Sequence, residues 1–118
     1  MAKAELNATL VALADRNRRA VIDILKEQPR RAGEIASALS MTPPALSRHL
    51  RVLRRSGLID EQGVEADARV RIYRLRKEPF DQLRGWLGEV ESFWTGELAA
   101  FREHVERSKS RRGGPAKR

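Results

Sequence analysis

Apolar residues recur at helical spacing over the N-terminal part of the chain. Leu6, Leu10 and Leu13 lie four and three residues apart, which places them on one face of a helix. A second amphipathic run follows Asp15, a residue type that often caps helix N-termini. It ends before Pro29, because proline disfavours helical geometry at the residue that precedes it. The pattern therefore predicts two helices, and the inward positions of the second are Val21, Ile24 and Leu25.

Two shorter helices are predicted next, over residues 32–39 and 43–55. A three-residue turn at 40–42 separates them, and Thr42 is placed to cap the second of the two. Gly57 follows that helix, at a position where the left-handed backbone of a helix C-terminus favours glycine. The inward positions of the second helix are Leu46, Leu50 and Leu53.

The pattern changes after this glycine from helical spacing to the alternation that is typical of strands. Residues 58–61 predict a short strand, residues 62–68 are polar, and residues 69–76 predict a second strand. Two strands joined by a polar tip make a β-hairpin over residues 59–75. The alternation in the second strand is imperfect and leaves open which side is buried: one side holds Val70, Ile72 and Arg74, and the other holds Arg69, Arg71, Tyr73 and Leu75.

A long amphipathic helix is predicted over residues 80–106. Apolar side chains recur there every three or four residues: Phe80, Leu83, Leu87, Val90, Trp94, Leu98, Phe101 and Val105. A helix of this length extends about 40 Å, and Trp86 and Phe93 widen its apolar stripe. A chain of 118 residues has too little other surface to cover such a stripe, so the stripe predicts dimerisation rather than a ligand pocket.

The basic residues are concentrated at the C-terminal end. The net charge is +8, from 24 basic and 16 acidic residues. Residues 107–118 contribute six positive charges and no acidic residue, which leaves a net charge of +2 for residues 1–106. We therefore expect one domain over residues 1–106, which includes the long C-terminal helix. Residues 107–118 are expected to form a basic, disordered tail, whose charge suits polyanions irrespective of their sequence.

Several classes of function are disfavoured by what the sequence lacks. The chain has no cysteine and two histidines, His49 and His104, which excludes thiolate metal sites and leaves little material for a metal centre. We expect no cofactor and no enzyme activity, because there is no glycine-rich phosphate loop and because Ser47 and His49 point apart on their helix. No apolar run is long enough for a membrane helix or a secretory signal, so a cytoplasmic location is expected.

The order of the predicted elements indicates a DNA-binding motif. A short helix, a tight turn and a second helix make a helix-turn-helix, and a hairpin that follows makes the motif winged. The outer face of the second helix carries side chains that suit the major groove of DNA: Ser47, Arg48, Arg51, Arg54 and Arg55. For His49, at the flank of this face, phosphate contact and helix packing are both open. For Arg16, Arg18 and Arg19 we favour packing around the helical body over phosphate contact.

Five segments resemble the ArsR (arsenical-resistance repressor) family of bacterial transcription factors. The segment LADRNRR at 13–19 resembles the opening of the family's domain, and EIA at 34–36 resembles its next helix. The segments LSRHLRVL at 46–53 and GLI at 57–59 are similar to the part of the family that reads DNA. The segment RIYRL at 71–75 resembles the second strand of the wing.

The resemblance covers roughly residues 8–100 and implies a mainly helical winged helix-turn-helix with four helices, two strands and a last helix. It also implies a homodimeric repressor that binds double-stranded DNA at a palindromic operator, through the 43–55 helix and the 59–75 wing. The residues expected to contact DNA are Thr42, Pro44, Ser47, Arg48, His49, Arg51, Arg54, Arg55, Arg69 and Arg71. The residues expected at the dimer interface are Leu6, Leu10, Leu83, Leu87, Val90, Trp94, Leu98 and Phe101.

The chain departs from the family's pattern in ways that bear on function. Many members sense metals through cysteines in the helix that corresponds to 32–39, and this chain has none. The metal site of the last helix is not matched either, since His104 is its only histidine. Pro43-Pro44 is unusual at the start of the recognition helix and alters the expected sequence preference. A small-molecule inducer is left open, and the alternative function is a winged-helix module that binds protein or RNA without operator specificity.

Overall fold

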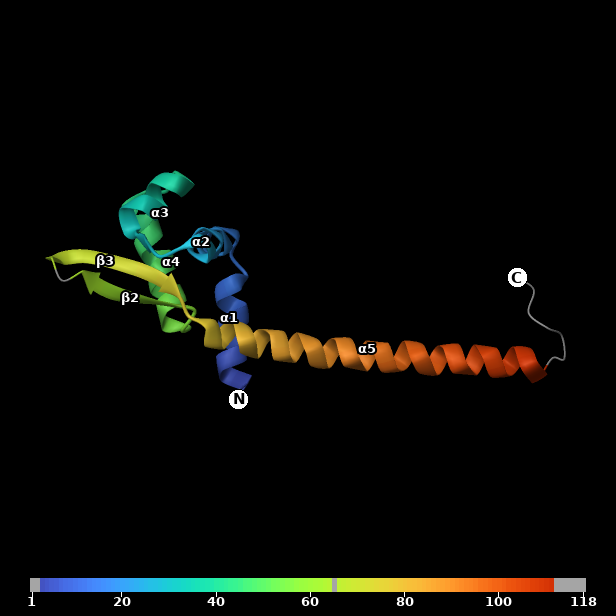
Figure 1. Ribbon diagram of the computed structural model, residues 1–118. Helices are drawn as coiled ribbons and strands as arrows, with labels where there is room; N and C mark the ends of the chain where they lie inside the picture. Colours follow the sequence, from blue (N-terminus) through green and yellow to red (C-terminus); the bar gives the residue numbers. More distant parts are fainter. Residues whose placement is uncertain (1–2, 65, 112–118) are drawn as a thin grey trace. The chain divides into compact units, whose positions relative to one another are not determined.

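The computed structural model describes residues 3–64 and 66–111 (Figure 1). It is a mainly helical winged helix-turn-helix with a small antiparallel sheet. The described residues form two compact units, which divide between Leu83 and Arg84. In chain order the elements are α1 (Lys3–Leu13), α2 (Arg16–Glu27), β1 (Arg30–Arg31), α3 (Ala32–Leu39), α4 (Pro43–Arg55), β2 (Ile59–Val64), β3 (Asp67–Leu75) and α5 (Lys77–Arg111).

Helix α2 begins at a capped N-terminus, as the sequence predicts. The carboxylate of Asp15 accepts hydrogen bonds from the backbone N–H of Asn17 at 2.7 Å and of Arg18 at 3.1 Å. The bond from Arg18 is the main cause that holds the pKa of Asp15 below its usual value. These bonds satisfy amides that the first turn of a helix leaves without intrahelical partners.

Two arginines of α2 stabilise the end of the preceding helix. Arg18 Nε donates to the carbonyl of Ala12 at 2.7 Å, and Arg19 Nη1 donates to the carbonyl of Leu13 at 2.7 Å. Cations are favourable at a helix C-terminus, where the last carbonyls lack partners within the helix. The structure thus gives Arg18 and Arg19 the packing role that the sequence analysis favoured.

The helix-turn-helix has the predicted bounds, 32–39 and 43–55. Ser40 adopts a left-handed conformation with φ of 52°, and the next backbone N–H, of Met41, donates to the carbonyl of Ala36 at 2.9 Å. At the start of α4, the hydroxyl oxygen of Thr42 accepts from the N–H of Ala45 at 3.3 Å. The predicted cap and turn are both confirmed.

The end of α4 is fixed by Gly57. Its φ is 81°, and its N–H donates to the carbonyl of Arg54 at 3.0 Å. The N–H of Leu58 reaches back to the carbonyl of Leu53 at 3.0 Å, which completes the hydrogen-bond pattern of a glycine C-cap. Leu58 and Ile59 then enter the core, so the chain passes directly from the recognition helix into the wing.

The sheet has three strands in the order β1-β3-β2, and all pairings are antiparallel. Strands β2 and β3 form the predicted hairpin, with Ile59 opposite Leu75 and a register shift between Gly63 and Val64. Strand β1, in which Arg30 pairs with Tyr73, was not predicted. Two residues are too few to show an alternation, and the strand with which they pair is distant in the sequence.

The core lies between the helices and the base of the wing. Its buried apolar residues are Ala12, Val21, Ile22, Leu25, Ile35, Leu46, Leu50, Leu53, Leu58, Ile59 and Tyr73. The predicted inner positions of α4 are confirmed. In α2, Ile22 is buried although it was not predicted to face inward. Ile24, which was predicted to face inward, is partly buried and packs at the edge of the core. Helix α1 buries its small residues Thr9 and Ala12, whereas Leu10 on the same helix is 40% exposed.

Helix α5 is longer than predicted at both ends. It begins at Lys77, before Pro79, because proline is tolerated in the first turn of a helix, where its missing N–H has no intrahelical partner. It continues to Arg111, so the first five residues of the predicted tail are helical, and residues 112–118 lie outside the described residues. None of the helices in the described parts of the chain has the length and hydropathy needed to cross a lipid bilayer.

Candidate nucleic-acid interface

A stripe of solvent-facing side chains runs along α4, on the side away from the core. Pro44, Arg48, Arg51 and Arg55 follow one another at spacings of four, three and four residues, and all four are exposed. Helical geometry places residues with this spacing on one face. Within the described parts of the chain, the three arginines have no ion-pair partner. We call these four residues the outer stripe.

One flank of α4 is tied to the wing. Arg54 Nη2 lies 3.4 Å from Glu61 Oε1 of β2. The same carboxylate hydrogen-bonds to Tyr73 of β3, and burial together with that contact raises the pKa of the tyrosine. Glu61 therefore links the recognition helix to both strands of the hairpin. The role of Glu61 was not predicted, because no local sequence pattern indicates a contact between a helix and a strand.

The other flank of α4 faces the start of α2. His49 is half-buried, and its Coulombic interaction with Asp15 is a minor cause, after the backbone hydrogen bonds, of the lowered pKa of Asp15. A histidine between two helices fits the packing alternative, while its partial exposure leaves room for a phosphate. Contact of His49 with a phosphate therefore stays a prediction. Ser47, which was also predicted to contact DNA, is exposed.

The wing carries two of the predicted DNA contacts, and they differ in how they are held. The side chain of Arg69 is 91% exposed, and its only ion pair among the described residues is a 3.5 Å contact with Asp67. Arg71 lies opposite Gly63 in the register, and its guanidinium crosses that glycine so closely that a Cβ there would lie 2.6 Å from Arg71 Nη1. Glycine at position 63 thus leaves space for the arginine.

A third wing arginine has an intramolecular partner. Arg74 Nε donates to Asp60 Oδ1 at 2.8 Å, and a second nitrogen lies 3.5 Å from Oδ2. The carboxylate stabilises the charged guanidinium and raises the pKa of Arg74. Arg74 was not among the predicted DNA contacts, and this pairing gives it a structural role at the base of the hairpin.

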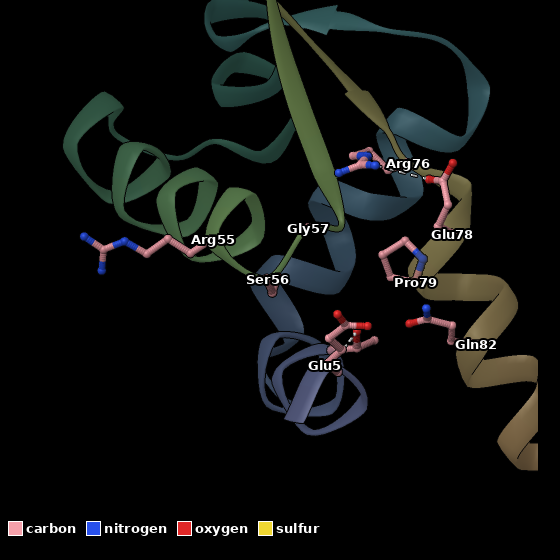
Figure 2. Close-up of a pocket in the computed structure, with 9 residues that line it drawn as sticks. Glu5, Arg55, Ser56, Gly57, Arg76, Glu78, Pro79 and Gln82 are labelled. Atoms are coloured by element: carbon pink, nitrogen blue, oxygen red, sulfur yellow. Dashed lines mark hydrogen bonds and ion pairs between the residues drawn. The ribbon is translucent and has the colours of Figure 1, made fainter. Parts of the chain in front are cut away.

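A polar cavity of about 320 Å³, which the sequence analysis did not predict, lies behind the end of α4 (Figure 2). Its lining residues are Glu5, Thr9, Arg55, Ser56, Gly57, Arg76, Glu78, Pro79 and Gln82. Arg76 and Glu78 form an ion pair of 3.6 Å at its edge. Figure 2 shows the side chain of Arg55 extending away from the other labelled side chains, which is consistent with its place in the outer stripe.

The second unit exposes the predicted apolar stripe of α5. Trp94, Leu98 and Phe101 are each about two-thirds exposed, and Leu87 and Val90 also reach solvent. Phe93 and Trp86 belong to the same exposed surface, although the predicted interface residues did not include them. Their aromatic side chains and their helical spacing could have identified them as part of this surface. On α1, Leu10 and the unpredicted Val11 are exposed, while Leu6, like Leu83 on α5, is half-buried.

Metal-ligating side chains do not gather anywhere in the described residues. No group of three or more His, Asp or Glu side chains is placed to hold a metal ion in residues 3–64 or 66–111. Separately, the exposed side chains of α4 and of the wing include several arginines. The chemistry of such side chains suits the recognition of a polyanion.

The sequence is similar to known bacterial regulatory proteins. The sequence signature of the bacterial regulatory proteins of the arsR family matches residues 15–61. The chain is 34% identical over 95 residues to the HTH-type transcriptional regulator Rv2034 of Mycobacterium tuberculosis, and the match covers 80% of this chain and 83% of that protein. It is 32% identical over 56 residues to the transcriptional repressor SdpR of Bacillus subtilis, covering 48% of this chain and 62% of SdpR.

Solved structures show the same fold. The crystal structure of the ArsR family transcriptional regulator RHA00566 is 34% identical in sequence, with a TM-score of 0.72 and coverage of 80% of this chain and 95% of that chain. The homodimeric winged helix-turn-helix domain Mb0332 of Mycobacterium bovis is 24% identical, with a TM-score of 0.60 and coverage of 75% and 80%. The chain therefore belongs to the ArsR family of DNA-binding transcriptional regulators, which are not enzymes.

Proposed function

We propose that the protein is a homodimeric repressor that binds a palindromic operator through α4 and the wing. The observation that carries this proposal is the outer stripe, whose basic side chains face solvent while the opposite side of the same helix is buried in the core. A helix packed on the core, with three guanidinium groups that have no ion-pair partner among the described residues, is complementary to the major groove of DNA. As a regulator of bacterial promoters, the protein acts in the cytoplasm.

The side chains of α4 divide into those that contact base edges and those that contact the phosphate backbone of DNA. Arg48 lies in the N-terminal half of the helix, where recognition helices approach base edges, and arginine donates two hydrogen bonds to guanine. Pro44 and Ser47 lie beside it. The phosphate contacts come from the second half of α4, from its N-cap and flank, and from the wing: Thr42, His49, Arg51, Arg54, Arg55, Arg69 and Arg71.

Dimerisation follows from the apolar surface of α5. A stripe with three side chains about two-thirds exposed is costly in water, and a second copy of the chain covers it symmetrically. The Mycobacterium bovis domain with this fold is a homodimer. The interface then combines Leu6 and Leu10 of α1 with the α5 residues Leu83, Leu87, Val90, Trp94, Leu98 and Phe101.

Repression follows from occupancy. A dimer bound across a promoter excludes the polymerase, and SdpR, with which this chain shares 32% identity over 56 residues, is a transcriptional repressor. Two recognition helices related by a two-fold axis enter major grooves about 34 Å apart, so the operator is an inverted repeat.

Selection from a random duplex-DNA pool with the full chain tests this proposal. The expected product is an inverted repeat with half-sites about one helical turn apart, each containing a guanine. The enriched duplex, called the selected duplex below, should retain a preference over random DNA at two salt concentrations. If no motif emerges and binding disappears at the higher salt, the net charge alone binds DNA. The protein is then a winged-helix module without operator specificity.

A further inference from the structure

The first turn of α4 offers no backbone amide to DNA. Pro43 and Pro44 have no N–H, and the N–H of Ala45 donates to the hydroxyl of Thr42 at 3.3 Å. The next amide, of Leu46, donates to the carbonyl of Thr42 at 3.0 Å. Helix N-termini commonly bind phosphate through free amides. This one presents no free N–H at positions 43–46.

The same turn presents apolar surface instead. Both pyrrolidine rings are exposed, and Pro44 begins the outer stripe, one helical turn before Arg48. In helix-turn-helix proteins the N-terminal residues of the recognition helix contact base edges. If α4 enters the major groove as proposed, the ring of Pro44 lies at the floor of the groove, one helical turn from Arg48.

The apolar group on the floor of the major groove is the C5-methyl of thymine. We propose that Pro44 is a specificity-determining residue that reads the C5-methyl of a pyrimidine, beside the guanine read by Arg48. This inference rests on the proposed function. The proline ring is fixed before binding, so its contact costs no side-chain conformational entropy. An unmethylated cytosine at that position leaves the ring without its partner.

Replacing single thymines of the selected duplex by deoxyuridine tests the inference, because this change removes only the methyl group. At one position in each half-site, the wild-type chain should lose affinity by about three- to fivefold, the amount expected for one buried carbon. At that position a 5-methylcytosine–guanine pair should bind more tightly than an unmethylated one, which separates the methyl group from the rest of the base.

Two variants locate the effect. Pro44→Ser should abolish the difference between thymine and deoxyuridine, because it removes the ring from the outer stripe. Pro43→Ser is the matched control: Pro43 is also exposed but lies off the stripe, so this variant should keep the difference. Circular dichroism checks that both variants remain folded.

The results separate this inference from the proposed function. If the selected duplex depends on Arg48 but no deoxyuridine substitution weakens binding, Pro44 does not read a methyl group. The inference also fails if Pro44→Ser keeps the full sensitivity to deoxyuridine. A selection that yields no motif at all overturns the proposed function itself, and the inference with it.

Discussion

Trp94→Glu is expected to produce a monomer that no longer binds the selected duplex at concentrations that saturate the wild type. The indole of Trp94 is 68% exposed in the single chain and lies in the middle of the apolar stripe of α5. A carboxylate there must be desolvated when two stripes meet, without a partner to compensate. Once the two recognition helices bind independently, the loss of avidity lowers DNA affinity by about a hundredfold or more.

Analytical ultracentrifugation and a DNA titration measure the two parts of this prediction. The matched control is Ser92→Glu, which adds the same charge two residues earlier on α5, where the helical repeat places the side chain away from the stripe. Ser92→Glu should remain a dimer with wild-type affinity. A Trp94→Glu variant that sediments as a dimer places the interface elsewhere.

Arg48→Ala is expected to weaken binding to the selected duplex by about 1–3 kcal/mol, while its affinity for random DNA changes far less. The reason is that a bidentate contact with guanine distinguishes sequences, whereas phosphates are the same in every duplex. Arg48 is exposed and without an ion-pair partner among the described residues, so its removal leaves no buried charge behind. Competition binding with the two DNAs measures the change in preference.

Arg69→Ala is the matched control for this prediction. Its side chain is 91% exposed on the wing, and the proposed contact is with phosphate. The variant should weaken binding to both DNAs by a similar factor and reduce the dependence of affinity on salt. If Arg48→Ala instead weakens binding to both DNAs by a similar factor, as expected for Arg69→Ala, then Arg48 contacts the phosphate backbone of DNA and another residue reads the bases.

The helix-turn-helix was predictable because its signals are local. Thr42 caps the helix it precedes, Gly57 ends that helix, and Leu46, Leu50 and Leu53 define its buried side by spacing alone. Each of these features acts within a few residues. For the same reason the outward side of α4, with its arginines, could be read from the sequence before any tertiary contact was known.

The features that the sequence did not reveal depend on distant partners. Strand β1 exists because Arg30 and Arg31 pair with β3, more than 40 residues later. The link between Arg54, Glu61 and Tyr73 joins three elements that no spacing rule connects.

Helix α1 was predicted as a helix, but its buried side was not identified. Its apolar residues are not confined to one side, so leucine spacing did not reveal that the small residues Thr9 and Ala12 face the core.

Two copies of α4 that read one duplex from the same side need a fixed spacing between the half-sites, and a spacing series on the selected duplex measures this requirement. Inserting about five base pairs between the half-sites rotates one of them by half a helical turn, to the opposite face of the DNA. This insertion should lower affinity to that of a duplex with a single half-site. Unchanged affinity would show instead that the two half-sites are not bound by one rigid dimer.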